Sequence, residues 1–169
     1  MNEILQLERI ADNVFRYNSD LSTLEPNMID FIKNKAIHHT LQRARINFHN
    51  TDDDTVQEMI IAMTNNTIVE PHCHKNKCES FHIIEGTVRV GFLDSFSEIE
   101  SVVELGGKYK YYRLNSPKYH IVIPITKIVV VHEVTKGPFV KGKSSTIMKL
   151  NPKELNLLQQ KIINWQDNE

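Results

Sequence analysis

The sequence predicts a mainly β protein, a sandwich or small barrel with a helical segment before it and a helix after it. Short β-rich runs separated by turn residues fill the stretch from Val56 to Phe139. Apolar residues recur at helical spacing in residues 20–48, and again after Asn151-Pro152. These three observations fix the predicted order of helical segment, strands and helix.

The chain has 169 residues, a length that suits one domain with a sizeable core. We expect this single domain to divide into a mainly helical N-terminal extension (1–50), a β-barrel core (54–140) and a C-terminal helix (152–166).

The N-terminal extension is expected to hold one or two helices within residues 20–48. Ser22 and Thr23 precede the helical pattern and are candidate caps. The apolar residues that carry the pattern are Met28, Ile29, Ile32, Ile37 and Leu41.

The barrel core is expected to contain about eight strands at near-regular spacing. Turn residues separate them, among them Asn65-Asn66, Gly86, Gly106-Gly107 and Ser116-Pro117. The strand runs are EMIIAM, TIVEPH, SFHIIE, TVRVGFLD, EIESVVEL, KYYRL, YHIVIPI and KIVVVHEV. After them, Leu155, Leu158, Ile162 and Trp165 predict a closing amphipathic helix.

Charge and apolar content exclude several classes of partner. Lys and Arg together number 20 against 21 Asp and Glu, and no long one-signed block occurs, so we expect no nucleic-acid or membrane surface. The first twenty residues lack the apolar stretch of a signal peptide, which predicts a cytoplasmic protein with Cys73 and Cys78 as free thiols. A small molecule is the expected partner.

The segment PHCHKNKCE (71–79) carries the main chemical signal. In an extended segment alternate side chains share a face, so His72 and His74 point one way and Cys73 the other. A short hairpin-like link can bring Glu79 back to the two histidines. Two imidazoles and one carboxylate suit a divalent ion, namely iron, manganese, nickel or zinc, and leave room for a ligand.

A fourth ligand is expected from another strand, and His120 is the leading candidate because it follows the turn at Asn115 to Pro117. Two other interpretations of the segment stay open. A zinc-finger arrangement would use Cys73 and Cys78, although no second Cys/His pair stands downstream at the usual spacing. The histidines would otherwise belong to a polar loop without a ligand.

The spacing of these residues resembles the first motif of the cupin superfamily, G-x5-H-x-H-x3 or x4-E-x6-G. From Asn66 to Gly86 this chain reads N-x5-H-x-H-x4-E-x6-G, and only the first glycine differs. Asn is the residue that best replaces glycine in a left-handed turn. The second cupin motif survives only as Pro117 and His120 in SPKYH.

Over residues 43–154 the chain more closely resembles the WbuC family of cupin-fold metalloproteins, which are associated with cell-surface polysaccharide (O-antigen) biosynthesis. The stretches that carry the resemblance are RARINFH, VQEMIIAM, PHCHKNKCESFHIIEGTVRVGFLD, YHIVI, HEVTKGPF and NPKE. The resemblance implies a cupin double-stranded β-helix, or jelly-roll barrel. It further implies one divalent metal ion bound by His72, His74, Glu79 and His120.

Other polar residues are candidates for the pocket around the metal. Arg45, Asn47 and His49 alternate in ARINFH, a pattern that fits a clamp for a carboxylate or sugar hydroxyls and equally fits a solvated strand edge. Glu133 stands in the apolar run KIVVVHEV, where a buried carboxylate needs a partner or a role in the pocket. Acid–base chemistry needs a proton carrier, for which His49, Tyr119 and Glu133 are candidates.

Three functions fit this site. The first is a metal-dependent sugar isomerase or epimerase in polysaccharide metabolism, and the second is an iron-dependent dioxygenase acting on a small substrate. The third is a non-catalytic cupin that binds a sugar or a metal and regulates a partner. We expect a homodimer, because the resemblance implies pairing through sheet edges, as is common in cupins, and the helical segments carry apolar faces that can cover those edges or build a dimer.

Overall fold

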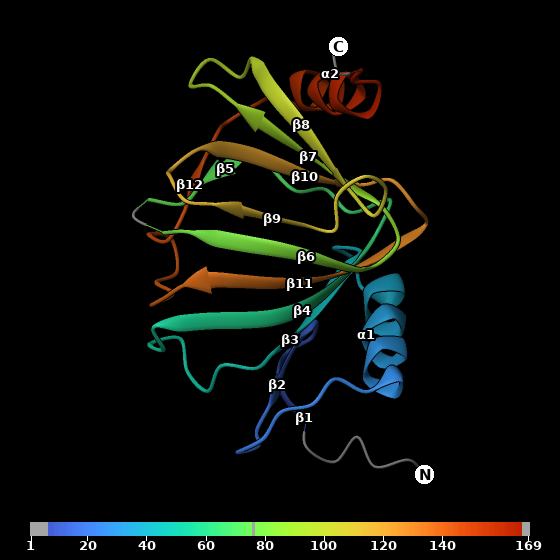
Figure 1. Cartoon of the computed structure of the whole chain (residues 1–169), viewed down its shortest axis with the longest axis vertical. Helices are drawn as coiled ribbons and strands as arrows, with labels where there is room; N and C mark the ends of the chain where they lie inside the picture. The colour runs from blue at the N-terminus through green and yellow to red at the C-terminus, as the bar shows by residue number, and fades with distance from the viewer. Residues whose placement is uncertain (1–6, 76, 167–169) are drawn as a thin grey trace.

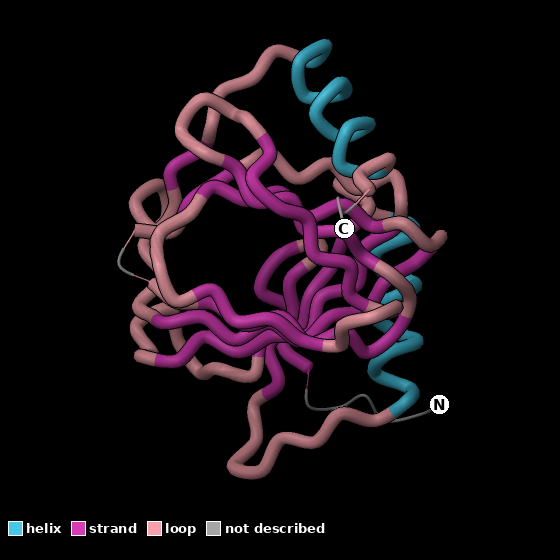
Figure 2. The backbone as a smooth tube through the Cα atoms, turned by 45° about the horizontal axis from the view of Figure 1, so that its top comes forward, coloured by secondary structure: helices cyan, strands magenta, loops and turns pink. Residues whose placement is uncertain are grey.

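The computed structural model describes residues 7–75 and 77–166, and these form two β-sheets with a helix on the outside of each (Figure 1). One sheet has seven strands in the order β1-β2-β3-β4-β11-β6-β9, and the other has five in the order β12-β5-β10-β7-β8. Helix α1 covers the first sheet and helix α2 the second. Figure 2 shows the two sheets facing each other as layers. The predicted mainly β fold with an N-terminal and a C-terminal helix is confirmed.

Fourteen elements follow one another along the described part of the chain. The helices are α1 (Pro26–His38) and α2 (Pro152–Ile163). The strands are β1 (Leu7–Ala11), β2 (Val14–Tyr17), β3 (Arg43–Asn47), β4 (Val56–Thr64), β5 (His72–Cys73), β6 (Glu79–Glu85), β7 (Val88–Leu93), β8 (Ile99–Leu105), β9 (Tyr111–Leu114), β10 (Tyr119–Pro124), β11 (Ile128–Lys136) and β12 (Thr146–Ile147). Neither helix is long and apolar enough to cross a membrane.

Alternation along each strand separates three apolar clusters. On β11, Val129 and Val131 face the space between the sheets, whereas Val130 faces α1. On β10, Val122 faces the interior while Ile121 packs against α2. Because side chains alternate with period two, each central strand supplies both an interior and an exterior core. The interior face is the one that reaches the candidate site.

The expected mainly helical extension is wrong for most of residues 7–50. One helix is present, and β1, β2 and β3 extend the larger sheet, with β2 and β3 pairing in parallel. The helix begins at Pro26 after Glu25, so Ser22 and Thr23 are not its caps. Proline at the first helical position loses no hydrogen bond, which explains the start. Residues 1–6, 76 and 167–169 of the expected single domain lie outside the described residues.

Two turn residues of the cupin-like motif behave differently. Gly86 has φ of +80°, and a Cβ there would collide with the hydroxyl of Thr126 and the carbonyl of Ile128, so this position requires glycine. Asn66 takes the place of the first glycine of the motif. Among the described non-glycine residues, the positive φ values belong to Gln42 and Ser97, so Asn66 does not use the left-handed conformation that asparagine tolerates.

Candidate metal centre

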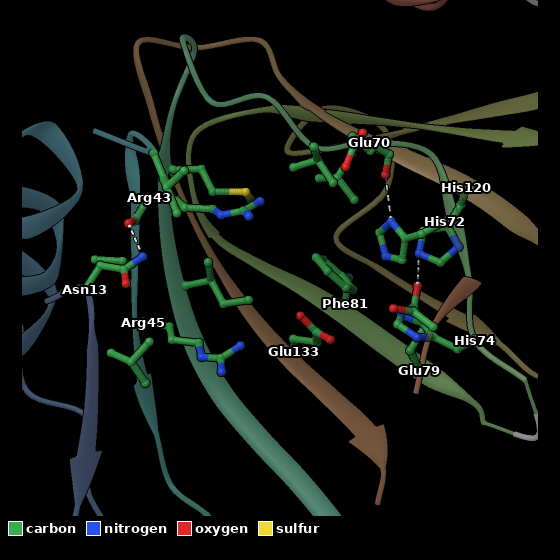
Figure 3. Close-up of a pocket in the computed structure, with 18 of the residues that line it drawn as sticks. Asn13, Arg43, Arg45, Glu70, His72, His74, Glu79, Phe81, His120 and Glu133 are labelled. Atoms are coloured by element: carbon green, nitrogen blue, oxygen red, sulfur yellow. Dashed lines mark hydrogen bonds and ion pairs between the residues drawn. The ribbon is translucent and has the colours of Figure 1, made fainter. Parts of the chain in front are cut away.

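Three histidines meet at one end of the space between the sheets. His72 lies on β5 and His120 on β10, and these two residues are direct partners in the antiparallel pairing of the strands. His74 follows β5. Ligand nitrogens of the three rings lie within 4.8 Å of one another, and the His72 and His120 ring centroids are 4.4 Å apart (Figure 3). The expected convergence of the histidines is confirmed, and the three nitrogens are close enough to share one ion.

Each of these imidazoles is held through its Nδ1 by a backbone carbonyl. His72 Nδ1 lies 2.9 Å from the carbonyl oxygen of Glu70, and His74 Nδ1 lies 3.2 Å from that of Ser144. His120 Nδ1 lies 3.1 Å from the carbonyl oxygen of Lys118. A carbonyl only accepts, so Nδ1 must carry the hydrogen and donate it. The Nε2 lone pairs are therefore left for a metal, which is the arrangement typical of metal-binding histidines.

Glu79 completes the cluster from the other sheet. Glu79 is 2% exposed, and its two oxygens lie 3.3 Å from Nε2 of His74 and 3.2 Å from Nε2 of His120. The buried hydroxyl of Tyr112 donates a hydrogen bond of 2.8 Å to Glu79 Oε1. Burial opposes ionisation, but the hydrogen bond from His74, the charge of His120 and the hydrogen bond from Tyr112 lower the pKa of Glu79. The carboxylate is thus available as a fourth ligand.

The protonation states also suit a metal. Burial, followed by the charge of the neighbouring His120, lowers the pKa of His72 to about 4, so its ring is neutral at physiological pH. Burial also acts to lower the pKa of His74, but the hydrogen bond and charge of Glu79 raise it. A divalent ion would take the place of the proton that His74 and Glu79 otherwise share.

The two cysteines take no part in this cluster. Cys73 is buried on the opposite face of β5, and burial raises the pKa of its thiol. Cys78 lies near the surface, where its sulfur accepts a hydrogen bond of 3.1 Å from Arg113. Among the described residues, the cluster that could hold a metal contains histidines and no thiol. A zinc-finger arrangement is therefore not formed.

A cavity of about 460 Å³ opens beside the histidines. This size lies within the range of roughly 300–1,000 Å³ that is usual for small-molecule sites. The histidines and Glu79 form one wall, Arg43 and Arg45 from β3 reach in from the opposite side, and Glu133 from β11 lies between them (Figure 3). Apolar side chains such as Phe81 and Val122 complete the lining.

The other predicted pocket residues divide into three groups. Arg45 and Glu133 line the cavity. His49 is buried in a smaller adjoining cavity of about 130 Å³, where its Nδ1 contacts the Glu58 carbonyl oxygen at 3.0 Å. Asn47 is 2% exposed, lines neither cavity, and its buried Oδ1 has no hydrogen-bond partner among the described residues.

Tyr119 is not part of the site. It packs with Leu93 and Ile121 in the apolar cluster under α2, on the face of β10 opposite to His120. Since adjacent residues of a strand point to opposite faces, a Tyr next to His120 has to face away. The expectation for Tyr119 is corrected accordingly.

Two residues of the site were missed. Arg43 shares the interior face of β3 with Arg45, and the alternation that singled out Arg45 applies to it equally. Tyr112 is one of two consecutive tyrosines on β9, and the sequence alone does not say which of them faces inward. The structure places Tyr112 against Glu79 and leaves Tyr111 51% exposed.

Of the comparisons with known proteins, only those with solved structures bear on the fold. A family model described as a domain of unknown function (DUF6016) matches residues 24–105, which contain Arg43, Arg45, His72, His74 and Glu79 but not His120 or Glu133. No curated protein matches the chain.

Among solved structures, protein SO0799 from Shewanella oneidensis is similar with a TM-score of 0.56 and 8% identity over 73% of this chain and 88% of its own. An oxalate oxidase in complex with the substrate analogue glycolate is similar with a TM-score of 0.50 and 11% sequence identity, and the match covers 74% of each chain. The capsular polysaccharide assembling protein CapF from Staphylococcus aureus is similar with a TM-score of 0.51 and 15% sequence identity over 63% of this chain.

Some of these proteins are much longer than this chain, which spans 32% of CapF and 27% of an oxalate decarboxylase from Lactobacillus farciminis. At these identities the likeness concerns the fold alone, and that fold is the cupin type of double-layered β-barrel.

Proposed function

We propose that this protein is a divalent-metal-binding cupin of the WbuC type that acts on a sugar in cell-surface polysaccharide metabolism, as a metal-dependent isomerase or epimerase. The metal site is supported chiefly by the shared contact of Nδ1 with a backbone carbonyl in His72, His74 and His120. This contact leaves Nε2 of each ring free as a ligand within one cluster. The polysaccharide context comes from the sequence resemblance described above.

The proposed ligands fit a divalent ion in number and in kind. Three neutral imidazole nitrogens and one carboxylate suit iron, manganese, nickel or zinc and leave coordination positions free for a ligand. A bound ion would supply Lewis-acid polarisation of a carbonyl or hydroxyl oxygen on the sugar. Tyr112 would keep Glu79 in its ligating orientation through the hydrogen bond of 2.8 Å.

Glu133 is the proposed acid–base residue. It lines the cavity, and within residues 7–75 and 77–166 its carboxylate forms no ion pair or hydrogen bond with another side chain. Burial, together with the neighbouring charge of Glu79, raises the pKa of Glu133 to about 7, so that both protonation states are populated near neutral pH. Such a carboxylate can take a proton from a carbon next to a carbonyl and return it to the adjacent carbon.

The metal site is tested by elemental analysis of the purified protein and of two single-residue variants. The wild type should contain about one ion per chain, and His72→Ala should lose it. His132→Ala is the matched control, because this histidine bonds Glu58 at 2.8 Å and lies outside the cluster. An unchanged metal content in His72→Ala would refute the proposed coordination.

The reaction is tested separately in heavy water with a panel of aldoses and ketoses. The metal-loaded wild type should introduce solvent deuterium at a carbon of one of these sugars, and Glu133→Gln should do so at least about 100-fold more slowly. If the protein binds metal but exchanges no carbon-bound hydrogen in any of the sugars, the isomerase assignment is wrong while the metal site stands.

A further inference from the structure

The wall of the cavity opposite the histidines holds two cationic side chains to which the described part of the chain offers no acceptor. Arg43 and Arg45 both project from β3 into the cavity (Figure 3). None of the ion pairs or side-chain hydrogen bonds found among residues 7–75 and 77–166 involves either guanidinium, and Nε of Arg45 is buried without a partner. A buried, charged donor with no acceptor is unfavourable, which points to an acceptor supplied from outside the chain.

The backbone fixes both arginines in place. The N-terminal hairpin turn holds β3 through Asn13, whose amide donates to the Arg43 carbonyl at 3.1 Å and whose carbonyl accepts from the Arg45 N–H at 2.9 Å. Strand β2 then pairs in parallel with β3 from Val14 onward, and β4 pairs with its other edge. The two guanidiniums therefore stand on an inner strand of the seven-stranded sheet rather than on a loop, which positions them more precisely.

The charges of the cavity leave a positive excess once a divalent ion is bound. Arg43 and Arg45 supply two positive charges and the ion two more, against three carboxylates among the lining residues, namely Glu70, Glu79 and Glu133. Burial, followed by the charge of Arg45, lowers the pKa of Arg43, a direction in keeping with two like charges on one wall of the cavity. A ligand with a negative group would offset the excess positive charge and the repulsion between the two guanidiniums.

The volume limits the size of that ligand. If each non-hydrogen atom takes about the 30 Å³ that a water molecule takes in the liquid, roughly 15 such atoms fill the cavity. A monosaccharide phosphate or a small hydroxy acid has this size. A complete nucleotide-linked sugar exceeds it, so only its sugar part would fit inside.

We propose that Arg43 and Arg45 form an oxyanion subsite, and that the ligand of this cavity is a small hydroxylated acid whose carboxylate or phosphate binds the two guanidiniums while its hydroxyl or carbonyl oxygens face the histidines. The orientation toward the histidines rests on the proposed metal site. The recognition of the acid group by the arginines does not.

Calorimetry with two matched pairs of probes tests the proposal on the metal-loaded protein. Ribose 5-phosphate is compared with ribose, and malate with its neutral diamide. Each acid should bind at least roughly tenfold more tightly than its neutral counterpart, since a hydrogen bond to a charged group is worth about one to two powers of ten in affinity. The acid that shows the larger preference identifies phosphate or carboxylate as the natural group.

Variants assign the preference to the arginines. Arg43→Gln and Arg45→Gln should each lose most of the preference while keeping the metal content of the wild type. Arg9→Gln is the matched control, because Arg9 is exposed on β1 and pairs with Asp12 at 2.6 Å. If a glutamine variant does not fold, the lysine variant keeps the charge, loses the two-pronged geometry and should retain a reduced preference.

A chelator-treated sample separates this proposal from the metal site. Inorganic phosphate should raise the melting temperature of the metal-free wild type, although by less than it raises that of the metal-loaded protein, because the two positive charges of the ion are gone. It should not raise the melting temperature of the variants Arg43→Gln and Arg45→Gln. This result supports the subsite even if the protein binds no metal. The proposal is overturned if neither acid binds more tightly than its neutral counterpart, or if both glutamine variants keep the full preference of the wild type.

Discussion

Replacing Tyr112 with phenylalanine should weaken metal binding without disturbing the fold. The change removes one hydroxyl, which donates to Glu79 Oε1 at 2.8 Å in a buried setting. The ring would remain, stacked on Phe81 at a centroid distance of 5.5 Å and edge-on to Phe92 at 5.6 Å. The perturbation is therefore confined to the orientation of a single carboxylate.

The magnitude follows from that one hydrogen bond. A hydrogen bond to a charged group contributes about 1.5–3 kcal/mol, and each 1.4 kcal/mol changes a dissociation constant about tenfold. Tyr112→Phe should therefore raise the dissociation constant for Zn²⁺ by roughly 10- to 150-fold, which agrees with the usual effect of removing a group that orients a metal ligand. Competition with a coloured chelator at constant pH measures it.

The neighbouring tyrosine provides the control. Tyr111 is 51% exposed, and its hydroxyl donates to Ser80 Oγ at 3.1 Å on the outside of the barrel. Tyr111→Phe should leave the dissociation constant within about twofold of the wild type. The reasoning is refuted if Tyr112→Phe binds Zn²⁺ as tightly as the wild type, or if both variants weaken binding equally.

Three further outcomes concern stability. In the metal-free protein the pKa of Glu133 is raised from 4.5 to about 7, so the free energy of unfolding falls as pH rises through this window. Glu133→Gln should remove this pH dependence and should be up to roughly 3 kcal/mol more stable than the wild type in urea unfolding at pH 8. An unchanged pH dependence in the variant would contradict the assignment. Gly91→Ala would collide with Ile162 of α2 and should lose about 1–3 kcal/mol in thermal unfolding, in contrast to Gly107→Ala, which meets only a flexible carboxylate. Asn151→Ala removes both cap hydrogen bonds of 3.0 Å and should lose about 1 kcal/mol in urea unfolding, an effect absent if the cap is dispensable.

The core strands and the histidine cluster were predictable from the sequence because both obey period-two alternation. His72 and His74 share a face in any extended segment, because they are two residues apart. The same rule predicts that His120 points inward together with Val122. The same rule applies to Tyr119, which adjoins His120 on the strand and therefore points outward, away from the site.

The N-terminal strands were not predictable from local pattern. β1 has no buried residue, and β2 places only Phe15 and Tyr17 on the apolar face, too few residues to establish a period-two pattern. These strands form because β2 pairs with β3, which in turn pairs with β4 in the interior of the seven-stranded sheet. Such pairing is a long-range effect that overrides local propensity. The choice of Tyr112 over Tyr111 likewise depends on how β9 registers against β6.

The candidate ligands belong to both layers of the barrel. His72 and His120 lie on strands of the five-stranded sheet, and Glu79 lies on a strand of the seven-stranded sheet, although no ladder of backbone hydrogen bonds joins the two sheets among the described residues. An ion held by these side chains would act as a cross-link between the layers, so its binding energy would add to the resistance of the whole domain to unfolding. The abundance of the folded protein would then follow the supply of that ion in its surroundings.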